Sequence, residues 1–200
     1  MSHPDAGPGG TMVLTATAID DATLVVRARE GDLTAFEALV ARYQKRIYQL
    51  ALRMTRDRAD AEDVTQEVFL TAWRRLPEIQ QEAAFSGWLY TTATNRCLTL
   101  LRKRRPITAL DEQDTHGEPA WTAPLGQDPQ RSAQTMAQLE ALSEALGQLT
   151  AAQRAVWLLR EAHGRSYDEI ARTMDTTPDS VRGRLSRARV QLAELMSPWH

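Results

Sequence analysis

The 200-residue chain is 42% apolar and 25% charged, a composition typical of a soluble globular protein of one large domain or two small ones. No apolar run approaches the roughly 18 to 20 residues that span a bilayer, and the N-terminus MSHPDAGPGGT lacks the basic-then-apolar pattern of a signal peptide. The single cysteine, Cys97, excludes an internal disulfide and fits a reducing compartment. We therefore expect a cytoplasmic protein.

Charge is divided unevenly along the chain, although the formal net charge is only −2. The segment NRCLTLLRKRRP, from Asn95 to Pro106, holds five basic residues and no acid, whereas residues 107–150 hold seven acids and one base. Near the C-terminus, SVRGRLSRAR has four arginines in ten residues. A polyanionic partner interacts with local segments of positive charge rather than with the net charge of the chain. Both basic segments are therefore candidate contacts for nucleic acid.

The first part of the chain predicts a tail followed by helices. Residues 1–19 are rich in proline and glycine, which favours a disordered tail. Apolar residues then recur at three-and-four spacing from Phe36 to Ala51, as in an amphipathic helix. A second helix is predicted in DAEDVTQEVFLTAWRRL, with Asp60 as its N-cap and Pro77 as its stop.

A third helix is predicted from near Phe85 to Leu101, before Pro106 ends it, and three helices can close a small core over residues 20–106. Residues 107–134 are rich in proline and acids and show no apolar period, which indicates a flexible acidic linker. The helical period returns over residues 135–200. The predicted fold is all-α: two small helical domains joined by a linker.

The C-terminal stretch LTAAQRAVWLLREAHGRSYDEIARTMDTTPDSVRGRLSRARVQL predicts three helices. Thr150 is placed to cap the first, and Ser166 with Glu169 forms a capping box at the start of the second. After the turn DTT, Pro178 falls in the first turn of the third helix, where its missing N–H costs nothing. A short helix, a tight turn and a longer helix form a helix-turn-helix, a motif typical of DNA binding.

The third helix has two distinct faces when projected at about 100° per residue. Its core stripe comprises Val181, Leu185, Ala188, Leu192 and Leu195. The opposite face carries small residues and arginines, which can sink into a major groove and bind guanine edges or phosphates. Arg184 and Arg189 flank the core stripe and are placed for phosphates or acidic partners. An isolated basic helix is equally well a solvated face, but the helix-turn-helix context favours DNA.

The stretches DAEDVTQEVFLTAW, FSGWLYTTATNRCLTLLRKRR, LTAAQRAVWLL and YDEIARTMDTTPDSVRGRLSRAR resemble the bacterial RNA polymerase sigma factors, in particular the small two-domain extracytoplasmic-function (ECF) group. Their order and spacing make the resemblance specific. It implies a domain that binds core polymerase and the minus-10 promoter element at residues 20–106, and one that binds the minus-35 element at 135–200. It also implies an anti-sigma factor as a partner and no enzyme activity.

The resemblance implies three binding surfaces. The surface for core polymerase comprises Asp63, Gln66 and Glu67. The surface for the minus-35 element comprises Arg182, Gly183, Arg184, Ser186 and Arg187. The surface for the minus-10 element comprises Trp88, Tyr90, Asn95, Arg96, Arg102, Lys103, Arg104 and Arg105.

Within the minus-10 surface, the resemblance implies that Asn95 reads exposed bases, and that a flipped base enters a pocket formed by the loop 77–86. Aromatic rings can stack on extruded bases, but we favour a core position for Trp88 and leave Tyr90 open. Many relatives carry an aspartate where this chain has Thr99 and a small polar residue where it has Gly183. These departures leave the promoter preference open.

Other function classes fit the sequence less well. The four histidines are scattered and form no zinc-ligand spacing with Cys97, and GPGG lacks the strand and helix of a phosphate loop. We therefore expect no metal site, no cofactor and no enzyme. A helix-turn-helix regulator with an N-terminal sensing domain is the main alternative, and it would bind its operator without polymerase. An adaptor that binds only protein does not explain two basic clusters.

Overall fold

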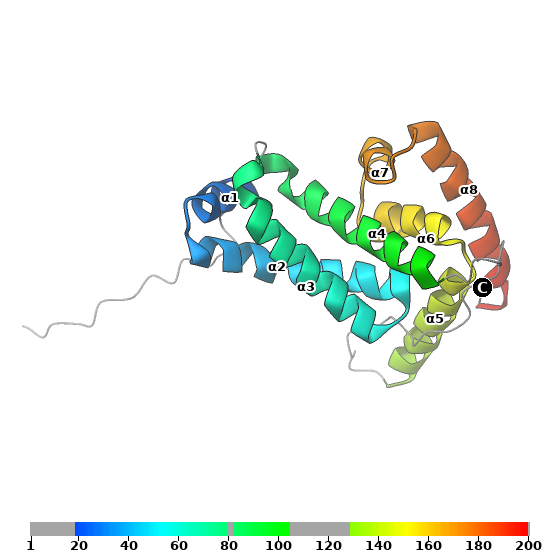
Figure 1. Ribbon diagram of the computed structural model, residues 1–200. Helices are drawn as coiled ribbons and strands as arrows, with labels where there is room; N and C mark the ends of the chain where they lie inside the picture. The colour runs from blue at the N-terminus through cyan, green and yellow to red at the C-terminus, as the bar shows by residue number, and fades with distance from the viewer. Residues whose placement is uncertain (1–18, 80–81, 105–128, 200) are drawn as a thin grey trace, which may run out of the picture.

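The computed structural model describes residues 19–79, 82–104 and 129–199, and every regular element within these ranges is helical. The N-terminal bundle comprises α1 (Asp21–Arg29), α2 (Leu33–Thr55), α3 (Arg58–Arg75), η1 (Leu76–Glu78), η2 (Glu82–Ala84) and α4 (Phe85–Arg104) (Figure 1). The C-terminal domain comprises α5 (Pro129–Gly147), α6 (Ala151–Trp157), the π-helical turn η3 (Leu158–Ala162), α7 (Tyr167–Thr173), α8 (Pro178–Leu195) and η4 (Ser197–Trp199). The all-α prediction is confirmed. The predicted tail and most of the predicted linker lie outside the described residues, and α5 begins within the range predicted as linker.

Aspartates begin the first three helices. Asp20 and Asp32 each accept a hydrogen bond from the backbone N–H three residues on, at 2.9 and 3.1 Å. Asp57 does the same for the N–H of Asp60 at 3.0 Å. Each bond satisfies a donor that the first helical turn leaves without a partner. The prediction of Asp60 as an N-cap is therefore wrong by one turn, since Asp60 is the residue whose N–H is capped.

The N-terminal core is built by four helices rather than the three predicted. Its buried side chains include Leu39, Ile47, Leu50, Val64, Val68, Phe85 and Leu89. The additional helix, α1, buries Leu24 and Val25 against α2. Its buried residues Leu24, Val25 and Ala28 have the helical spacing of three and four, but α1 has only nine residues, so the spacing occurs once and gives little periodic signal. Asp21 on α1 accepts hydrogen bonds from Arg42 and Tyr43 of α2, which fixes the two helices together.

The C-terminal domain contains the predicted helix-turn-helix. Thr150 caps α6 in a capping box with Gln153. Ser166 caps α7, and Glu169 returns a bond to the Ser166 N–H at 2.8 Å; this N–H holds the pKa of Glu169 at about 2. Pro178 stands at the first position of α8, as predicted. The predicted core stripe of α8 is buried except for its last member, which is partly exposed.

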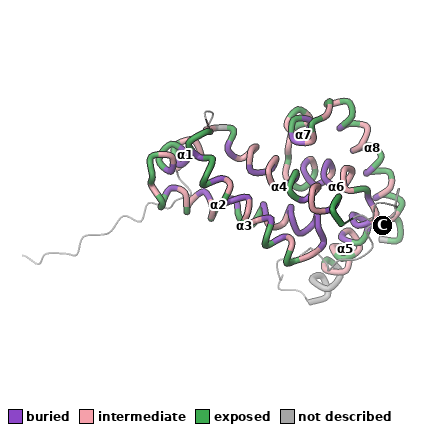
Figure 2. The backbone as a smooth tube through the Cα atoms, in the orientation of Figure 1, coloured by how far each residue is buried: buried purple, intermediate pink, exposed green. Residues whose placement is uncertain are grey.

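The two domains are in contact, and one continuous cluster of buried apolar side chains runs through both. Buried residues, purple in Figure 2, occur in both domains. At their junction the side chain of Arg154 on α6 is only 1% exposed. Its guanidinium donates to the carbonyls of Leu146 (2.8 Å), Gly147 (2.9 Å) and Leu149 (3.2 Å), at and just beyond the end of α5. It also donates to the carbonyl of Met54, in the last turn of α2, at 2.7 Å. Carbonyls at helix C-termini lack intrahelical donors and carry partial negative charge. One cation therefore caps two helices from two domains, a contact that the sequence did not predict.

Candidate nucleic-acid and polymerase interfaces

The outer face of α8 presents the residues predicted for the minus-35 element. Arg182, Ser186 and Arg187 are exposed, and Gly183 and Arg184 are partly exposed. A Cβ at Gly183 would lie 3.6 Å from the Nη1 atom of Arg187, an ordinary van der Waals distance, so the Arg187 guanidinium lies back across Gly183 on the same helical face. Among the described residues Arg187 makes no ion pair. The face thus offers a cation that no neighbour neutralises.

Two other arginines of α8, Arg182 and Arg189, have partners within the domain, and Arg184 is only partly exposed. Arg182 pairs with Asp179 and lies 5.4 Å from the ring centroid of Tyr167. Arg189 pairs with Glu161 at 2.5 Å, and its hydrogen bond to this carboxylate raises the pKa of Arg189. The prediction that Arg189 is placed for an acidic partner agrees with this geometry. Arg187 is consequently the arginine of this face that is most available to a ligand.

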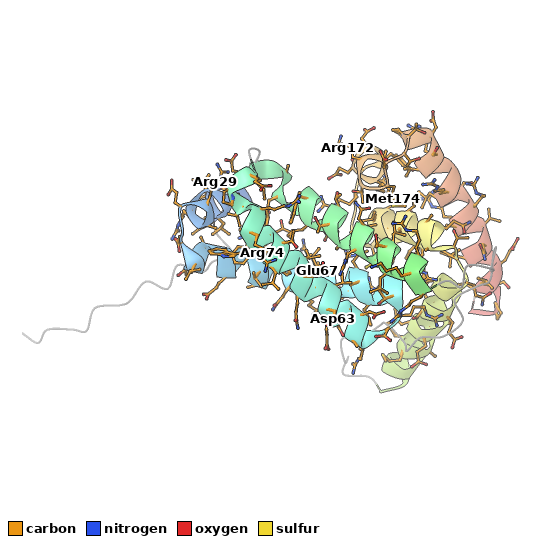
Figure 3. The ribbon with its side chains drawn as sticks, viewed as in Figure 1. Arg29, Asp63, Glu67, Arg74, Arg172 and Met174 are labelled. Atoms are coloured by element: carbon orange, nitrogen blue, oxygen red, sulfur yellow. The ribbon has the colours of Figure 1, made fainter. Side chains whose placement is uncertain are left out.

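The residues predicted to bind polymerase lie along one side of α3, where Figure 3 labels Asp63 and Glu67. Asp63 and Gln66 are exposed and Glu67 is partly exposed. Beside them a shallow hollow of about 330 Å³ opens between α2 and α3; its lining comprises Gln44, Lys45, Tyr48, Glu62, Thr65 and Gln66. The side chain of Gln66 therefore borders a space that can receive a partner's side chain.

Two apolar residues extend this side of α3 and were not predicted as part of it. Leu70 is 57% exposed and Trp73 is 38% exposed. Their spacing from Gln66, four and seven residues, places all three on one helical face. Trp73 packs against Phe36, with ring centroids 4.9 Å apart and ring planes tilted by 59°, so it is partly structural. Exposed apolar side chains next to polar ones are typical of protein interfaces. We call Asp63, Gln66, Leu70 and Trp73 the α3 surface.

The basic residues predicted for the minus-10 element follow the C-terminal half of α4. Asn95, Arg96, Arg102, Lys103 and Arg104 are all exposed, and Arg105 lies outside the described residues. Acids of α3 orient two of the arginines: Arg96 pairs with Glu67 and Arg104 with Asp60, both at 2.6 Å. Burial raises the pKa of Asp60 in spite of this pairing. We call Asn95, Arg96, Arg102, Lys103 and Arg104 the α4 cluster. The two ion pairs link this cluster to α3, the helix predicted to bind polymerase.

The two aromatic candidates on α4 differ in burial. Trp88 is partly exposed and packs against the core, and it lines a cleft of about 500 Å³ between the domains. Tyr90 is only 3% exposed and faces the C-terminal domain. Its hydroxyl lies 3.3 Å from Nδ1 of His163, and the guanidinium of Arg165 lies 4.1 Å from its ring centroid. In this arrangement Tyr90 is a contact between domains.

A larger cleft of about 790 Å³ separates α4 from the first part of the helix-turn-helix. One wall comprises Asn95, Leu98, Thr99, Leu101 and Arg102, and the other comprises Thr150, Ala151, Ala152, Arg172, Thr173, Met174 and Asp175. Figure 3 labels Arg172 and Met174 at the C-terminal end of α7. The structure therefore brings the predicted minus-10 residues opposite α7. Arg172 was not predicted beside these residues, because its position opposite α4 comes only from the packing of the two domains.

Several other classes of site have no support in the described ranges. No group of three or more histidines, cysteines, aspartates or glutamates is placed to hold a metal ion there. Burial raises the pKa of the Cys97 thiol to about 12, which keeps it protonated and unreactive. Within the same ranges, every helix is too short or too polar to cross a bilayer.

Comparisons with known proteins cover nearly the whole chain. Residues 39–107 match the family model described as Sigma-70 region 2, and residues 139–192 match the one described as Sigma-70, region 4. The chain is 36% identical over 185 residues to the RNA polymerase sigma-H factor of Pseudomonas aeruginosa, covering 89% of this chain and 94% of that protein. It is 32% identical over 191 residues to the ECF RNA polymerase sigma-E factor of Escherichia coli K12, covering 90% of this chain and 96% of that protein.

Solved structures show the same fold. CnrH, in complex with the cytosolic domain of CnrY, is similar with a TM-score of 0.65 and 26% identity, over 89% of this chain and 97% of that one. The sigma factor RpoE of Bartonella quintana, in complex with the anti-sigma factor NepR, has a TM-score of 0.64 and 22% identity, over 82% and 98%. The two-domain helical architecture is thus shared along the length of these chains.

Proposed function

Because the chain belongs to the ECF group of the sigma-70 family, we propose that it directs core RNA polymerase to its promoters through the α3 surface, the α4 cluster and the outer face of α8. The chain is a transcription initiation factor whose partners are core polymerase and promoter DNA. The observation that carries the assignment of surfaces is the exposed face of α8, where Arg187 lies across Gly183 on a capped helix-turn-helix.

The α8 face is proposed to enter the major groove of the minus-35 element. A helix-turn-helix places its second helix in this groove, and small residues such as Gly183 and Ser186 allow the helix backbone to approach the bases. Arg187 and Arg182 then reach guanine edges or phosphates, with Arg184 placed for a phosphate. Specificity comes from the base contacts, whereas the phosphate contacts fix the register.

The α4 cluster is proposed to hold the minus-10 element after its strands separate. Asn95 supplies both a donor and acceptors for the edge of an unpaired base, and the basic residues from Arg96 to Arg105 bind the phosphates of the same strand. Trp88 and Tyr90 are candidates for stacking on extruded bases, and the loop 77–86 for holding a flipped base. Binding the unpaired strand favours the open complex, and the polymerase carries out the chemistry, so the proposed role includes no catalytic step.

We expect that Gln66→Ala weakens binding to core polymerase by about five- to tenfold, equivalent to roughly 1–1.4 kcal/mol. The reason is that Gln66 borders the hollow between α2 and α3 and donates and accepts in the middle of the α3 surface. Fluorescence anisotropy of the labelled chain, titrated with core polymerase, measures the change. The matched control is Gln138→Ala on α5, which is also exposed. Equal affinities for Gln66→Ala and the parent chain would contradict this docking surface.

An anti-sigma factor is a further proposed partner, and the cytoplasm the proposed location. The relatives CnrH and RpoE were solved in complexes, the latter with an anti-sigma factor, and the cleft beside Asn95 opens between the two domains of this chain. The product of a neighbouring gene, mixed with the chain, is expected to form a complex that blocks polymerase binding. The absence of both complex and inhibition would argue against that gene product.

A ligand-sensing regulator is not favoured by the family assignment, and one comparison separates the two functions. Anisotropy of labelled promoter DNA is expected to rise specifically with the chain plus core polymerase, and not with the chain alone. Specific binding by the chain alone would support the regulator.

A further inference from the structure

We propose that the contact between the two domains is a closed state of the free chain, and that protonation of His163 opens it. The opening is a property of the chain alone. Only its consequence for promoter binding rests on the proposed function.

Local backbone geometry presents His163 to the other domain. The π-helical turn η3 ends with the N–H of His163 bonded to the carbonyl of Leu158 at 3.1 Å. Gly164 follows with φ +65°, a left-handed conformation that glycine adopts without strain. The chain therefore turns sharply at His163, and the imidazole points toward α4. There its ring centroid is 5.0 Å from that of Tyr90, and Nδ1 is 3.3 Å from the Tyr90 hydroxyl.

Other contacts join the domains along the same junction. Thr91 and Thr173 are hydrogen-bonded at 2.8 Å between α4 and α7. The guanidinium of Arg56, the residue that follows α2, lies against Gly147 at the end of α5, where a Cβ would come within 1.9 Å of its Nη1 atom. Arg154 bonds to both helices, as described above. Of the side chains in these contacts, His163 is the one whose ordinary pKa lies between pH 5 and 8.

The charges facing His163 come from three elements and are mostly positive. Arg46 and Arg53 act on it from α2, and Arg165 from its own connecting segment. The carboxylate nearby on α7, Glu169, is bonded to Arg165 at 2.9 Å and so is already paired. Burial first, and then the three arginines, lower the pKa of His163 to about 4. A proton on the imidazole is therefore disfavoured while the domains are in contact.

The direction of the pH effect follows from the difference between the pKa of His163 in the closed state and its pKa in the open state. In the open state His163 is solvated, with an ordinary pKa near 6.5. His163 contributes fully to the free-energy preference for the closed state above pH 6.5. This contribution is lost as the pH falls from about 6.5 toward 4, because the open state binds the proton first. Between pH 7.5 and 5.5 the ratio of open to closed chains is expected to rise about tenfold.

Opening matters for promoter binding because, in the closed state, the two DNA-binding surfaces lie too close together to reach both promoter elements. Elements centred near positions minus-10 and minus-35 are about 25 base pairs apart, which is about 85 Å of B-form DNA at about 3.4 Å per base pair. In the closed state α7 touches α4 through the bonded Thr91 and Thr173. The α4 cluster and the α8 face therefore cannot occupy both elements until the domains separate.

Thiol labelling of the free, full-length chain tests the proposal without DNA or polymerase. In Thr173→Cys the new thiol replaces a side chain that is 6% exposed at the junction, so it reacts only when the domains part. A dipyridyl disulfide is used because thiols attack it even at acid pH and release pyridinethione, and each rate is divided by that of the urea-unfolded chain at the same pH. Cys97, 0% exposed in the N-terminal core, reports unfolding of that domain when the labelled peptides are separated.

The expected result is that protection of the introduced thiol in Thr173→Cys falls about tenfold from pH 7.5 to 5.5 while protection at Cys97 is unchanged. In the double variant Thr173→Cys, His163→Gln, protection of the introduced thiol is expected to differ less than twofold between these pH values. Equal protection of this thiol at both pH values in the single variant would overturn the proposal. So would an equal fall in the double variant, or a parallel fall at Cys97.

Discussion

Replacing Arg154 by methionine is expected to lower the free energy of unfolding by about 3–5 kcal/mol. The guanidinium is buried, and its donors satisfy four carbonyl oxygens, three at the end of α5 and one at the end of α2. Methionine fills most of the volume but donates nothing, so these buried acceptors lose their partners and two helix C-termini lose their cation. Urea denaturation followed by circular dichroism measures the change.

Two further variants make this test specific to Arg154. Arg172→Met removes an exposed arginine of α7 and is expected to change stability by less than about 0.5 kcal/mol. Arg154→Lys keeps the charge but cannot reach four carbonyls, so its stability is expected to fall between those of the parent and Arg154→Met. A loss below about 1 kcal/mol for Arg154→Met would show that the carbonyls find other partners.

The second large effect is expected at the DNA-binding face: Arg187→Ala should reduce promoter-dependent transcription by about 5- to 150-fold, the equivalent of roughly 1–3 kcal/mol. Arg187 is exposed, makes no ion pair within the described residues and lies across Gly183 in the middle of the α8 face. Its loss removes a base or phosphate contact without disturbing the buried stripe of the same helix. Run-off transcription with saturating core polymerase measures the reduction.

Arg189→Ala is the matched control, since it removes an arginine of the same helix that is engaged with Glu161. Its transcription is expected to stay within about twofold of the parent. Binding of Arg187→Ala to core polymerase should also be unchanged, because the α3 surface is in the other domain. Equal transcription from Arg187→Ala and the parent chain would refute the placement of α8 in the minus-35 groove.

The local signals in the sequence predicted the helix-turn-helix well. The capping box joins Ser166 to Glu169, three residues on, and Pro178 acts through its place in the first turn of α8. These roles can be predicted from spacing alone. The buried stripe of α8 follows equally from the helical period. Asp60 shows the limit of such signals: Asp57 and Asp60 both precede the apolar run, and only the fold decides which one caps α3.

The contact between the domains was beyond sequence reasoning. Arg154 bonds to a carbonyl 100 residues away, and Tyr90 meets a histidine 73 residues away. Neither pairing leaves a periodic signal, because it depends on how two separately formed domains pack. For the same reason the sequence does not decide between base stacking and packing for Tyr90. Leu70 and Trp73 are a different case from the contacts between the domains. Their spacing from Gln66, four and seven residues, is visible in the sequence, but their exposure is visible only in the structure.

The most direct measurement of the central claim is run-off transcription from a library of genomic fragments, with core polymerase and with or without this chain. Transcripts are expected only when the chain is present, from fragments that share two spaced upstream elements. Their yield should fall with Arg187→Ala at saturating core polymerase and with Gln66→Ala at limiting core polymerase. An absence of such transcripts, together with sequence-specific DNA binding by the chain alone, would contradict a sigma factor and support a helix-turn-helix regulator.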